Sequence, residues 1–124
     1  MVAKTVLLVD DEEIVLGVGK QMLEKLGFSV LTAKNGKEAL DVYQNNQNDI
    51  DFVVLDMILP DMGAADTYDG LQSISPAIKV LLSSGYGADQ GTRELLSRGC
   101  SGFIQKPFSM NSLSEKIEEI LAGP

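Results

Sequence analysis

The sequence predicts an α/β protein, a single doubly wound parallel sheet with helices on both faces. Short apolar runs of strand length alternate with longer segments of helical periodicity, in roughly five pairs. The 124 residues suit one domain, and no linker, internal repeat or low-complexity segment divides them, so residues 1–124 are expected to form that domain. Hydrophobic residues make up 44% of the chain, which is enough for a shared core.

Five short runs are the predicted strands. Thr5–Val9 and Asp51–Leu55 are almost continuously apolar, which is typical of parallel strands covered on both faces. Lys79–Leu82 and Gly102–Ile104 are shorter runs of the same kind. Phe28–Thr32 alternates more between apolar and polar residues, which favours a strand at the edge of the sheet.

The first two helices carry clear start and stop signals. One is predicted from Val15, Val18, Met22 and Leu26, which recur at helical spacing before Gly27, a residue type that favours helix C-termini. The next is predicted to open with a capping box, because Glu38 follows Asn35 by three residues. It continues through Ala39, Leu40 and Tyr43.

The later helices are less uniform. Glu94–Ser97 is expected to end a helix near Gly99. The final helix is marked by Leu113, Ile117 and Ile120, and Ser112 and Glu115 are placed to cap it. Gly63–Pro76 contains two glycines and ends in proline, so its helix is expected to be short or irregular.

Composition excludes several classes of function. The formal net charge of −8 and the pI of about 4.3 disfavour direct binding to nucleic acids and to anionic membranes. The chain has no histidine, so imidazole bases, histidine metal ligands and phosphohistidine within this chain are excluded. Cys100 is the single cysteine and is expected to be a small buried filler. With neither a signal peptide nor a membrane span in the sequence, a cytoplasmic setting is expected.

Polar residues gather where the predicted strands end. Asp10 and Asp11 follow the first run, Asp56 follows the third, Ser84 ends the fourth, and Lys106 follows the fifth. Ligands of open parallel sheets bind outside the carboxyl ends of the strands, near the switch in strand order. If the first and third strands are neighbours, the three carboxylates converge.

Such a cluster suits metal-assisted phosphoryl transfer. Clustered carboxylates repel one another unless a cation joins them, and oxygen ligands alone suit Mg²⁺. One carboxylate can attack phosphorus, while a lysine and a hydroxyl hold the transferred oxygens. Each residue taken singly has a local explanation, such as a helix cap for Asp10 or Asp11, a turn for Asp56 or a solvated surface for Lys106. Their joint order at four strand ends favours a site.

These motifs resemble the receiver domain of response regulators in two-component signalling. The resemblance covers essentially the whole chain and implies a flavodoxin-like (βα)5 fold with sheet order 2-1-3-4-5. The segments that carry it are Val9-Asp10-Asp11-Glu12, Asp56-Met57-Ile58-Leu59-Pro60, Ser84-Gly85-Tyr86 and Lys106-Pro107-Phe108.

The resemblance also implies roles for residues of the site. Asp56 would be the phosphoryl acceptor. Mg²⁺ would be held by Asp10, Asp11, Asp56 and the backbone carbonyl of Ile58, with Asp11 the more direct ligand of the acidic pair and Asp10 often acting through water.

Three further roles follow from the same resemblance. Ser84 would be the switch hydroxyl and Lys106 the phosphoryl-pairing lysine, followed by a cis bond to Pro107. Phe103 would be the aromatic switch, and plain core packing explains this residue equally well.

Some positions depart from the family pattern. Many receivers carry glycine where Ala64 or Ala65 stands, which puts the third helix in doubt. Ile58 is apolar where relatives can be polar, and Tyr86 is bulky. Both flank the path of an attacking water, so slow self-dephosphorylation is expected.

The expected donor is a phosphohistidine on a separate histidine kinase or histidine phosphotransfer domain. The expected output surface lies around Gly87–Ser97, Phe103 and Met110–Leu121 and addresses a downstream protein or domain, without direct nucleic-acid contact or membrane insertion by this segment. The runs Ser84–Tyr86 and Gln105–Phe108 resemble receivers at the C-terminal ends of hybrid sensor kinases.

Two alternative functions stay open, although the chain is not expected to be an enzyme. A small aspartate-dependent phosphatase of flavodoxin-like fold would require a second aspartate, as general acid, at the position of Ile58. A phosphorylation-independent binding module would not need the full set of site residues. A glycine pattern from Gly85 to Gly91 has the wrong spacing and the wrong strand for a dinucleotide loop.

Overall fold

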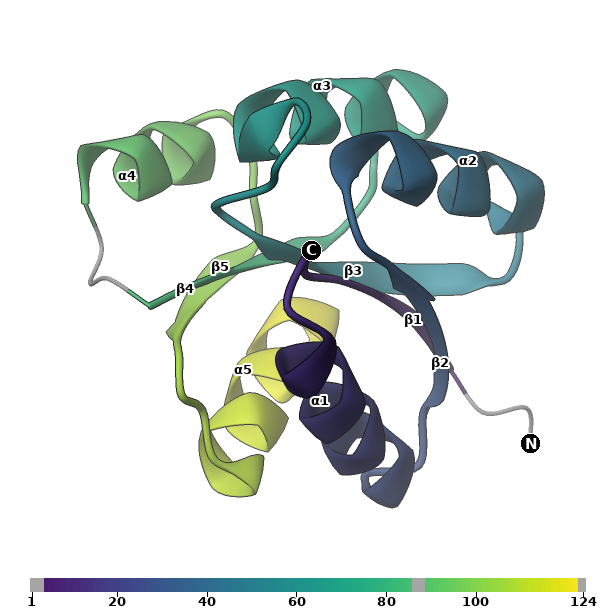
Figure 1. Cartoon of the computed structure of the whole chain (residues 1–124), viewed down its shortest axis with the longest axis vertical. Helices are drawn as coiled ribbons and strands as arrows, with labels where there is room; N and C mark the ends of the chain where they lie inside the picture. The colour runs from purple at the N-terminus through teal and green to yellow at the C-terminus, as the bar shows by residue number, and fades with distance from the viewer. Residues whose placement is uncertain (1–3, 86–88, 123–124) are drawn as a thin grey trace.

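The fold is a five-stranded parallel sheet between two helical layers, seen in a computed structural model that describes residues 4–85 and 89–122. The strand order is β2-β1-β3-β4-β5, with α1 and α5 on one face and α2, α3 and α4 on the other (Figure 1). The predicted fold class and strand order are therefore confirmed. The elements are β1 (Thr5–Val9), α1 (Glu13–Lys25), β2 (Ser29–Ala33), α2 (Gly36–Asn46), β3 (Ile50–Asp56), α3 (Gly63–Ile74), β4 (Val80–Ser84), α4 (Gln90–Ser97), β5 (Gly102–Gln105) and α5 (Met110–Ala122).

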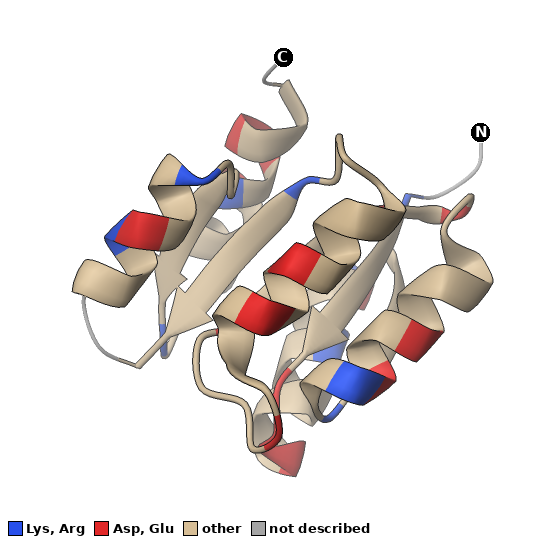
Figure 2. Ribbon diagram, turned by 90° about the horizontal axis from the view of Figure 1, so that it is seen from above, with Lys and Arg blue, Asp and Glu red and all other residues tan. Residues whose placement is uncertain are grey.

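Each central strand contributes to two hydrophobic cores because successive side chains point to opposite faces of the sheet. In β1, Val6 and Leu8 pack under α1 and α5, whereas Leu7 and Val9 pack under the other three helices. Burying such a side chain contributes roughly 1.5–3 kcal/mol relative to leaving it exposed. This explains why the predicted strands are almost continuously apolar, while most charged residues lie on helices and loops (Figure 2).

Helix α1 is present as predicted, but its buried stripe differs from the residues that predicted it. Leu16, Gly19 and Leu23 are the buried residues, whereas Val18 is 48% exposed. A Cβ atom at Gly19 would lie 2.9 Å from Leu8 Cδ2, so the helix approaches β1 where it has no side chain. Helical spacing of large apolar residues cannot reveal a contact made by glycine.

Helix α3 corrects the expectation of a short or irregular segment, because it runs regularly over 12 residues. Ala64, Thr67, Tyr68 and Leu71 are buried along it, and this packing stabilises the helix despite its glycine content. Gly70 is used for close contact with α2, since a Cβ atom there would lie 2.7 Å from a methyl group of Leu40. The alanines at positions 64 and 65 therefore do not prevent this helix.

The helix ends confirm two predicted signals and correct a third. Asn35 accepts a hydrogen bond from the Glu38 amide at 2.8 Å and begins α2 as predicted. Gly27 follows α1 with φ of 99°, a conformation that glycine adopts without strain. Helix α5, however, begins at Met110, and Ser109 accepts from the Ser112 amide at 3.1 Å. The predicted cap by Ser112 and Glu115 is wrong in its position, because the helix starts one turn earlier; Ser112 instead accepts from the Ser109 amide at 3.0 Å.

The helices of the described ranges, 4–85 and 89–122, include none that is long and apolar enough to cross a membrane.

Candidate functional site

Strand register brings the acidic residues together at one edge of the sheet. Val9 of β1 pairs with Leu55 of β3, so Asp10 and Asp56 occupy the next positions on adjacent strands. Lys106 reaches the same edge from β5, because its amide donates to the Ser84 carbonyl at 2.7 Å. Four strands therefore deliver polar groups to one place, at the reversal of strand order where open sheets bind ligands.

The core of the site is a cluster of three carboxylates. Asp10, Asp11 and Asp56 each offer one oxygen, and these oxygens lie within 4.8 Å of one another. Asp10 is 1% exposed and Asp56 is 4% exposed, whereas Asp11 lies at the surface. Two nearly buried carboxylates so close together are unfavourable unless cations compensate their charge.

Lys106 supplies part of that compensation. Its Nζ donates to Asp10 Oδ2 at 2.9 Å and lies 3.2 Å from Asp56 Oδ1. Burial alone would lower the pKa of Lys106, but its bonds and charge contacts with Asp10 and Asp56 outweigh burial and raise it. The ammonium group therefore stays charged between the two carboxylates. The peptide bond from Lys106 to Pro107 is cis, as the family resemblance implied.

Asp10 combines a local role with its role in the cluster. Its Oδ1 accepts from the Glu12 amide at 2.9 Å, which shapes the turn into α1, while Oδ2 faces Lys106. Glu12 itself begins α1 without a side-chain cap. The simple helix-cap interpretation of Asp10 is therefore not confirmed: Glu12 is the N-cap residue of α1, and Asp10 uses one oxygen in the turn before it and the other in the cluster.

Asp56 has an unusual protonation equilibrium. Its burial, together with the negative charge of Asp10, raises its pKa from 3.8 to about 6, although Lys106 opposes the shift. One lysine does not offset the cost of placing this carboxylate beside Asp10 in a buried position. The residue therefore favours a further cation or the loss of its own charge.

The other predicted site residues lie at different distances from this cluster. Ser84 is buried at the end of β4 and lines the same cavity as Asp56 and Lys106. Ile58 also lines that cavity and is 60% exposed. Phe103, on β5, is half-buried against the core beneath α2, α3 and α4 and does not line the cavity. Tyr86 lies outside the described residues.

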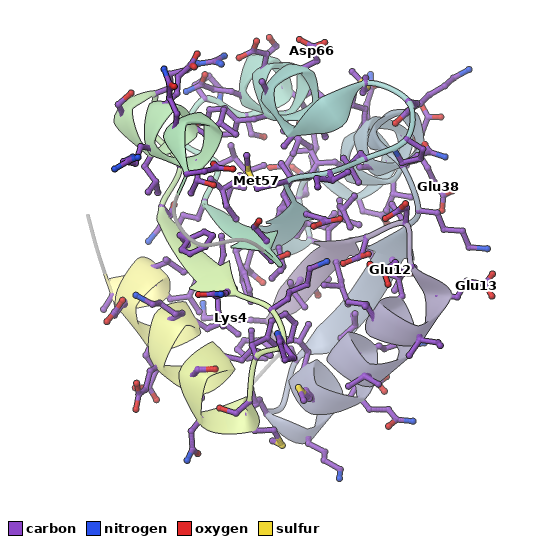
Figure 3. All side chains as sticks on the ribbon, turned by 60° about the vertical axis from the view of Figure 1, so that its left-hand side comes forward. Lys4, Glu12, Glu13, Glu38, Met57 and Asp66 are labelled. Atoms are coloured by element: carbon purple, nitrogen blue, oxygen red, sulfur yellow. The ribbon has the colours of Figure 1, made fainter. Side chains whose placement is uncertain are left out.

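A cavity of about 710 Å³ extends from the carboxylates along α1 and the segment after β5. One end is polar, and the other is walled by apolar side chains that the sequence analysis did not assign to a site. Among the described residues, the large hydrophobics that are well exposed are Ile14, Val18 and Ile58, and all three line this cavity. The sequence does carry a signal that Ile14 is exposed: it follows two charged residues, Glu12 and Glu13, and Glu13 points outward in Figure 3. The remaining apolar wall consists of Val15, Met22, Pro107 and Phe108.

The Cys100 thiol is separate from the site. It is buried, and its burial raises its pKa to about 12, which makes a reactive thiolate unfavourable and agrees with the expected filler role.

Comparisons with known proteins agree with this geometry. A family model described as the response regulator receiver domain matches residues 6–118. The sensor kinase CckA of Brucella abortus is 36% identical over 94% of this chain, which spans 12% of that kinase. The chemotaxis protein CheY of Thermotoga maritima is 30% identical over 94% of this chain and 97% of its own length. A chain in the crystal structure of the CheX–CheY–BeF3–Mg²⁺ complex from Borrelia burgdorferi superposes with a TM-score of 0.90 at 27% identity, covering 95% of this chain and 89% of that one.

Proposed function

The chain belongs to the response regulator receiver family, whose members are phosphorelay signalling modules rather than classical enzymes, and we propose that Asp56 is its phosphoryl acceptor. The observation that carries this proposal is the position of Asp56. It ends β3 in the acidic cluster, with the Lys106 ammonium 3.2 Å from its Oδ1. We further propose that residues 1–124 form one receiver domain and that it works in the cytoplasm.

The proposed reaction transfers a phosphoryl group from a phosphohistidine to Asp56. An Asp56 oxygen attacks phosphorus, the P–N bond to the donor imidazole breaks, and the leaving nitrogen keeps the bonding electron pair. The product is an acyl phosphate on Asp56. Lys106 neutralises charge on the transferred oxygens and Ser84 donates to one of them, because phosphoryl transfer depends mainly on positioning and charge stabilisation. The donor histidine belongs to another domain, since this chain has none.

The carboxylate cluster fits Mg²⁺. Its donors are all hard oxygens, its charge exceeds what Lys106 supplies, and Asp11 is exposed toward the solvent from which an ion would enter. Asp10, Asp11, Asp56 and the Ile58 carbonyl would hold the ion. When bound, Mg²⁺ would neutralise charge on the carboxylates and on the incoming phosphoryl oxygens. The similarity to a chain of the Borrelia complex that contains Mg²⁺ and BeF3 supports this proposal.

The apolar wall of the cavity is a candidate docking surface for the protein that donates the phosphoryl group. Ile14 and Val18 on α1 stand exposed beside the acceptor, at 82% and 48% of their surface, and large apolar side chains are seldom grouped in this way on a surface without a partner. We propose that the helix carrying the donor histidine, on a histidine kinase or a histidine phosphotransfer domain, packs against this wall. The similarity to CckA supports a hybrid sensor kinase as the setting of this receiver.

The output surface is proposed to involve α4, β5 and α5. Ser84 joins the site to β5 through its carbonyl, which accepts from Lys106, and through its register pairing with Gln105. Phe103 lies two residues before Gln105 and contacts the core under α4, where it could respond to Ser84. Residues 86–88, which include the start of the expected surface at Gly87, lie outside the described ranges.

Intact-mass analysis after incubation with acetyl phosphate tests the acceptor. We expect one added phosphoryl group that requires Mg²⁺ and is lost in Asp56→Asn. Asp51→Asn is the matched control, because Asp51 lies at the opposite end of the same strand, where it accepts from the Thr5 amide, and it should react like the wild type.

The absence of an adduct in the wild type would count against the proposal, and binding of beryllofluoride would then separate a short-lived acyl phosphate from a phosphorylation-independent binding module. Sustained turnover of phosphate esters would instead favour the aspartate-dependent phosphatase.

A further inference from the structure

The loop that follows the acceptor strand is tied to α2 by one side chain. Asp61 Oδ1 accepts from the Gly36 amide at 2.8 Å, and Asp61 Oδ2 accepts from the Lys37 amide at 2.9 Å. These are the first two residues of α2, where amides have no partner within the helix. Both oxygens of a loop carboxylate are therefore used to hold a helix that lies about 25 residues away in sequence.

The contact between α2 and the loop also requires glycine at position 36. A Cβ atom there would lie 2.4 Å from Met62 Cγ and 2.4 Å from Thr67 Oγ1, which no ordinary contact allows. Thr67 is buried, and its hydroxyl donates to the Gly63 carbonyl at 2.7 Å, so it has little freedom to move aside. The start of α2 therefore lies in close contact with Met62 at the end of the loop and with Thr67 in α3, in addition to its hydrogen bonds to Asp61.

The same loop, residues 57–62, contains the Ile58 carbonyl that is proposed to bind Mg²⁺. At its start the Met57 amide donates to the Ser83 carbonyl at 2.9 Å, and Leu59 is buried in the core. At its end Asp61 is fixed to α2. Ile58 lies between these two anchors, with its side chain exposed at the cavity. The direction of the Ile58 carbonyl therefore depends on both anchors.

We propose that Asp61 is a positioning residue for phosphoryl transfer: by clamping the loop onto α2, it orients the Ile58 backbone and so sets the affinity for Mg²⁺ and the rate at which Asp56 is phosphorylated. This inference rests on the function proposed above. Asp61 touches neither the metal nor the phosphoryl group and acts through the loop.

A purely structural role for Asp61 would give a different result, and α2 itself offers the control. Asn35 caps the same helix by accepting from the Glu38 amide at 2.8 Å, but it belongs to the segment next to the helix and does not bond the loop. Asn35→Ala and Asp61→Ala should both lower stability, because each leaves amides at the start of α2 without an acceptor. If Asp61 positions the loop, Asp61→Ala should also lower the Mg²⁺ affinity and the phosphorylation rate, whereas Asn35→Ala should not.

The test measures Mg²⁺ affinity by NMR titration, the phosphorylation rate with acetyl phosphate by intact mass, and stability by urea denaturation, for each variant. We expect Asp61→Ala and Gly36→Ala to weaken Mg²⁺ binding roughly tenfold, the lower end of what is typical for residues that orient metal ligands. Phosphorylation at limiting Mg²⁺ should slow in parallel. Asp61→Asn should fall between, because an amide keeps one acceptor oxygen, and it serves as the readout if the alanine variant does not fold. Asn35→Ala should stay within about twofold of the wild-type affinity.

Equal Mg²⁺ affinity in the wild type and both Asp61 variants would overturn the clamp, as would an equal loss in Asn35→Ala. A wild type that neither binds Mg²⁺ nor gains a phosphoryl group would instead overturn the proposed function itself, and the clamp with it. The wild-type measurement thus distinguishes the two failures.

Discussion

At the scale of single residues, Asp56 illustrates how position determines chemistry. An aspartate in water has an ordinary pKa near 4, but at the end of β3 it lies almost fully buried beside Asp10. The fold therefore keeps a carboxylate in a place that disfavours its charge. Binding of a cation relieves this cost, which links the unfavourable charge of Asp56 to the proposed Mg²⁺ site.

Because the folded protein disfavours the ionised form of Asp56, Asp56→Asn should gain stability in metal-free buffer, to an extent that depends on pH. The folded-state pKa of about 6 lies above the unfolded value of 3.8, so stability from the protonated carboxyl is present below pH 3.8 and is lost as the pH rises through 6. At pH 7.5 the variant should be more stable than the wild type by on the order of 1–3 kcal/mol, and the difference should shrink toward pH 5. Urea denaturation in EDTA at both pH values measures it.

Asp51→Asn again serves as the control: it keeps Asp56, so its stability should follow that of the wild type at both pH values. A variant that is no more stable than the wild type at pH 7.5 would contradict the unfavourable charge assigned to Asp56. Saturating Mg²⁺ should reverse the order, because the wild type gains binding energy that the variant loses.

Ile58 carries the prediction of a long-lived acyl phosphate. Its side chain is exposed at the cavity and has no polar group to orient water, while Tyr86, which shared this prediction, lies outside the described residues. Ile58→Asn should shorten the lifetime roughly tenfold by offering a hydrogen bond to an attacking water. The decay of the phosphorylated mass after removal of the donor measures this, with Ile58→Leu as the apolar control. Rapid decay in the wild type would show the prediction to be wrong.

At the scale of elements, α5 is fixed at both ends by side chains. Ser109 and Ser112 bond each other's amides at its start, at 3.1 and 3.0 Å. At its end, Lys79 Nζ donates to the Ile120 carbonyl at 2.8 Å, where a cation also suits the helix dipole. The helix that closes the apolar layer beside α1 is thus held against the sheet by polar contacts as well as by Leu113, Ile117 and Ile120.

The corrected helix start gives a prediction about stability. Ser109→Ala removes the acceptor for the Ser112 amide and should cost about 1 kcal/mol, a typical value for loss of an N-cap. Glu115→Ala, at a residue that the sequence favoured as part of the cap, should change stability by less than about 0.5 kcal/mol. The free energy of unfolding from urea titration compares the two. A larger loss of stability in Glu115→Ala than in Ser109→Ala would instead support the cap predicted from the sequence, at Ser112 and Glu115.

At the scale of the whole molecule, the site lies where the two helical layers diverge. The chain leaves β1 toward β2 through α1 on one face, and it leaves β3 toward β4 through α3 on the other (Figure 1). Met57, directly after the acceptor, points toward the layer of α3 and α4 (Figure 3), and its methyl group would lie 3.7 Å from a Cβ atom at Gly91. A change at Asp56 therefore has a short physical route to α4 as well as to β5.

This arrangement predicts which segments change their hydrogen exchange when an acyl-phosphate mimic binds. Beryllofluoride with Mg²⁺ should slow amide hydrogen exchange severalfold in the loop after β3, in β5 and in α4, while β2, at the far edge of the sheet, should change little. Mass spectrometry of peptides before and after addition measures it, with Asp56→Asn as the negative control. Protection confined to the site would indicate that α4 and β5 do not form the output surface.

Local patterns in the sequence were sufficient for the strands, most helix ends and the set of polar groups at the strand ends. Strand length, alternation, capping residues and glycine signals act over a few residues, so they can be read without the fold. The carboxyl ends of parallel strands share one edge, and by this rule the sequence alone predicts a site formed by Asp10, Asp56, Ser84 and Lys106.

Only the tertiary structure decided the features that join distant segments. The buried stripe of α1 depends on Gly19 meeting β1, and the regular course of α3 depends on its burial against α2 and the sheet. The apolar wall of the cavity and the bonds from Asp61 to α2 are of the same kind. The physical reason is common to all of them: each is a contact between side chains or amides far apart in the chain, and local periodicity carries no information about which distant surface a residue will meet.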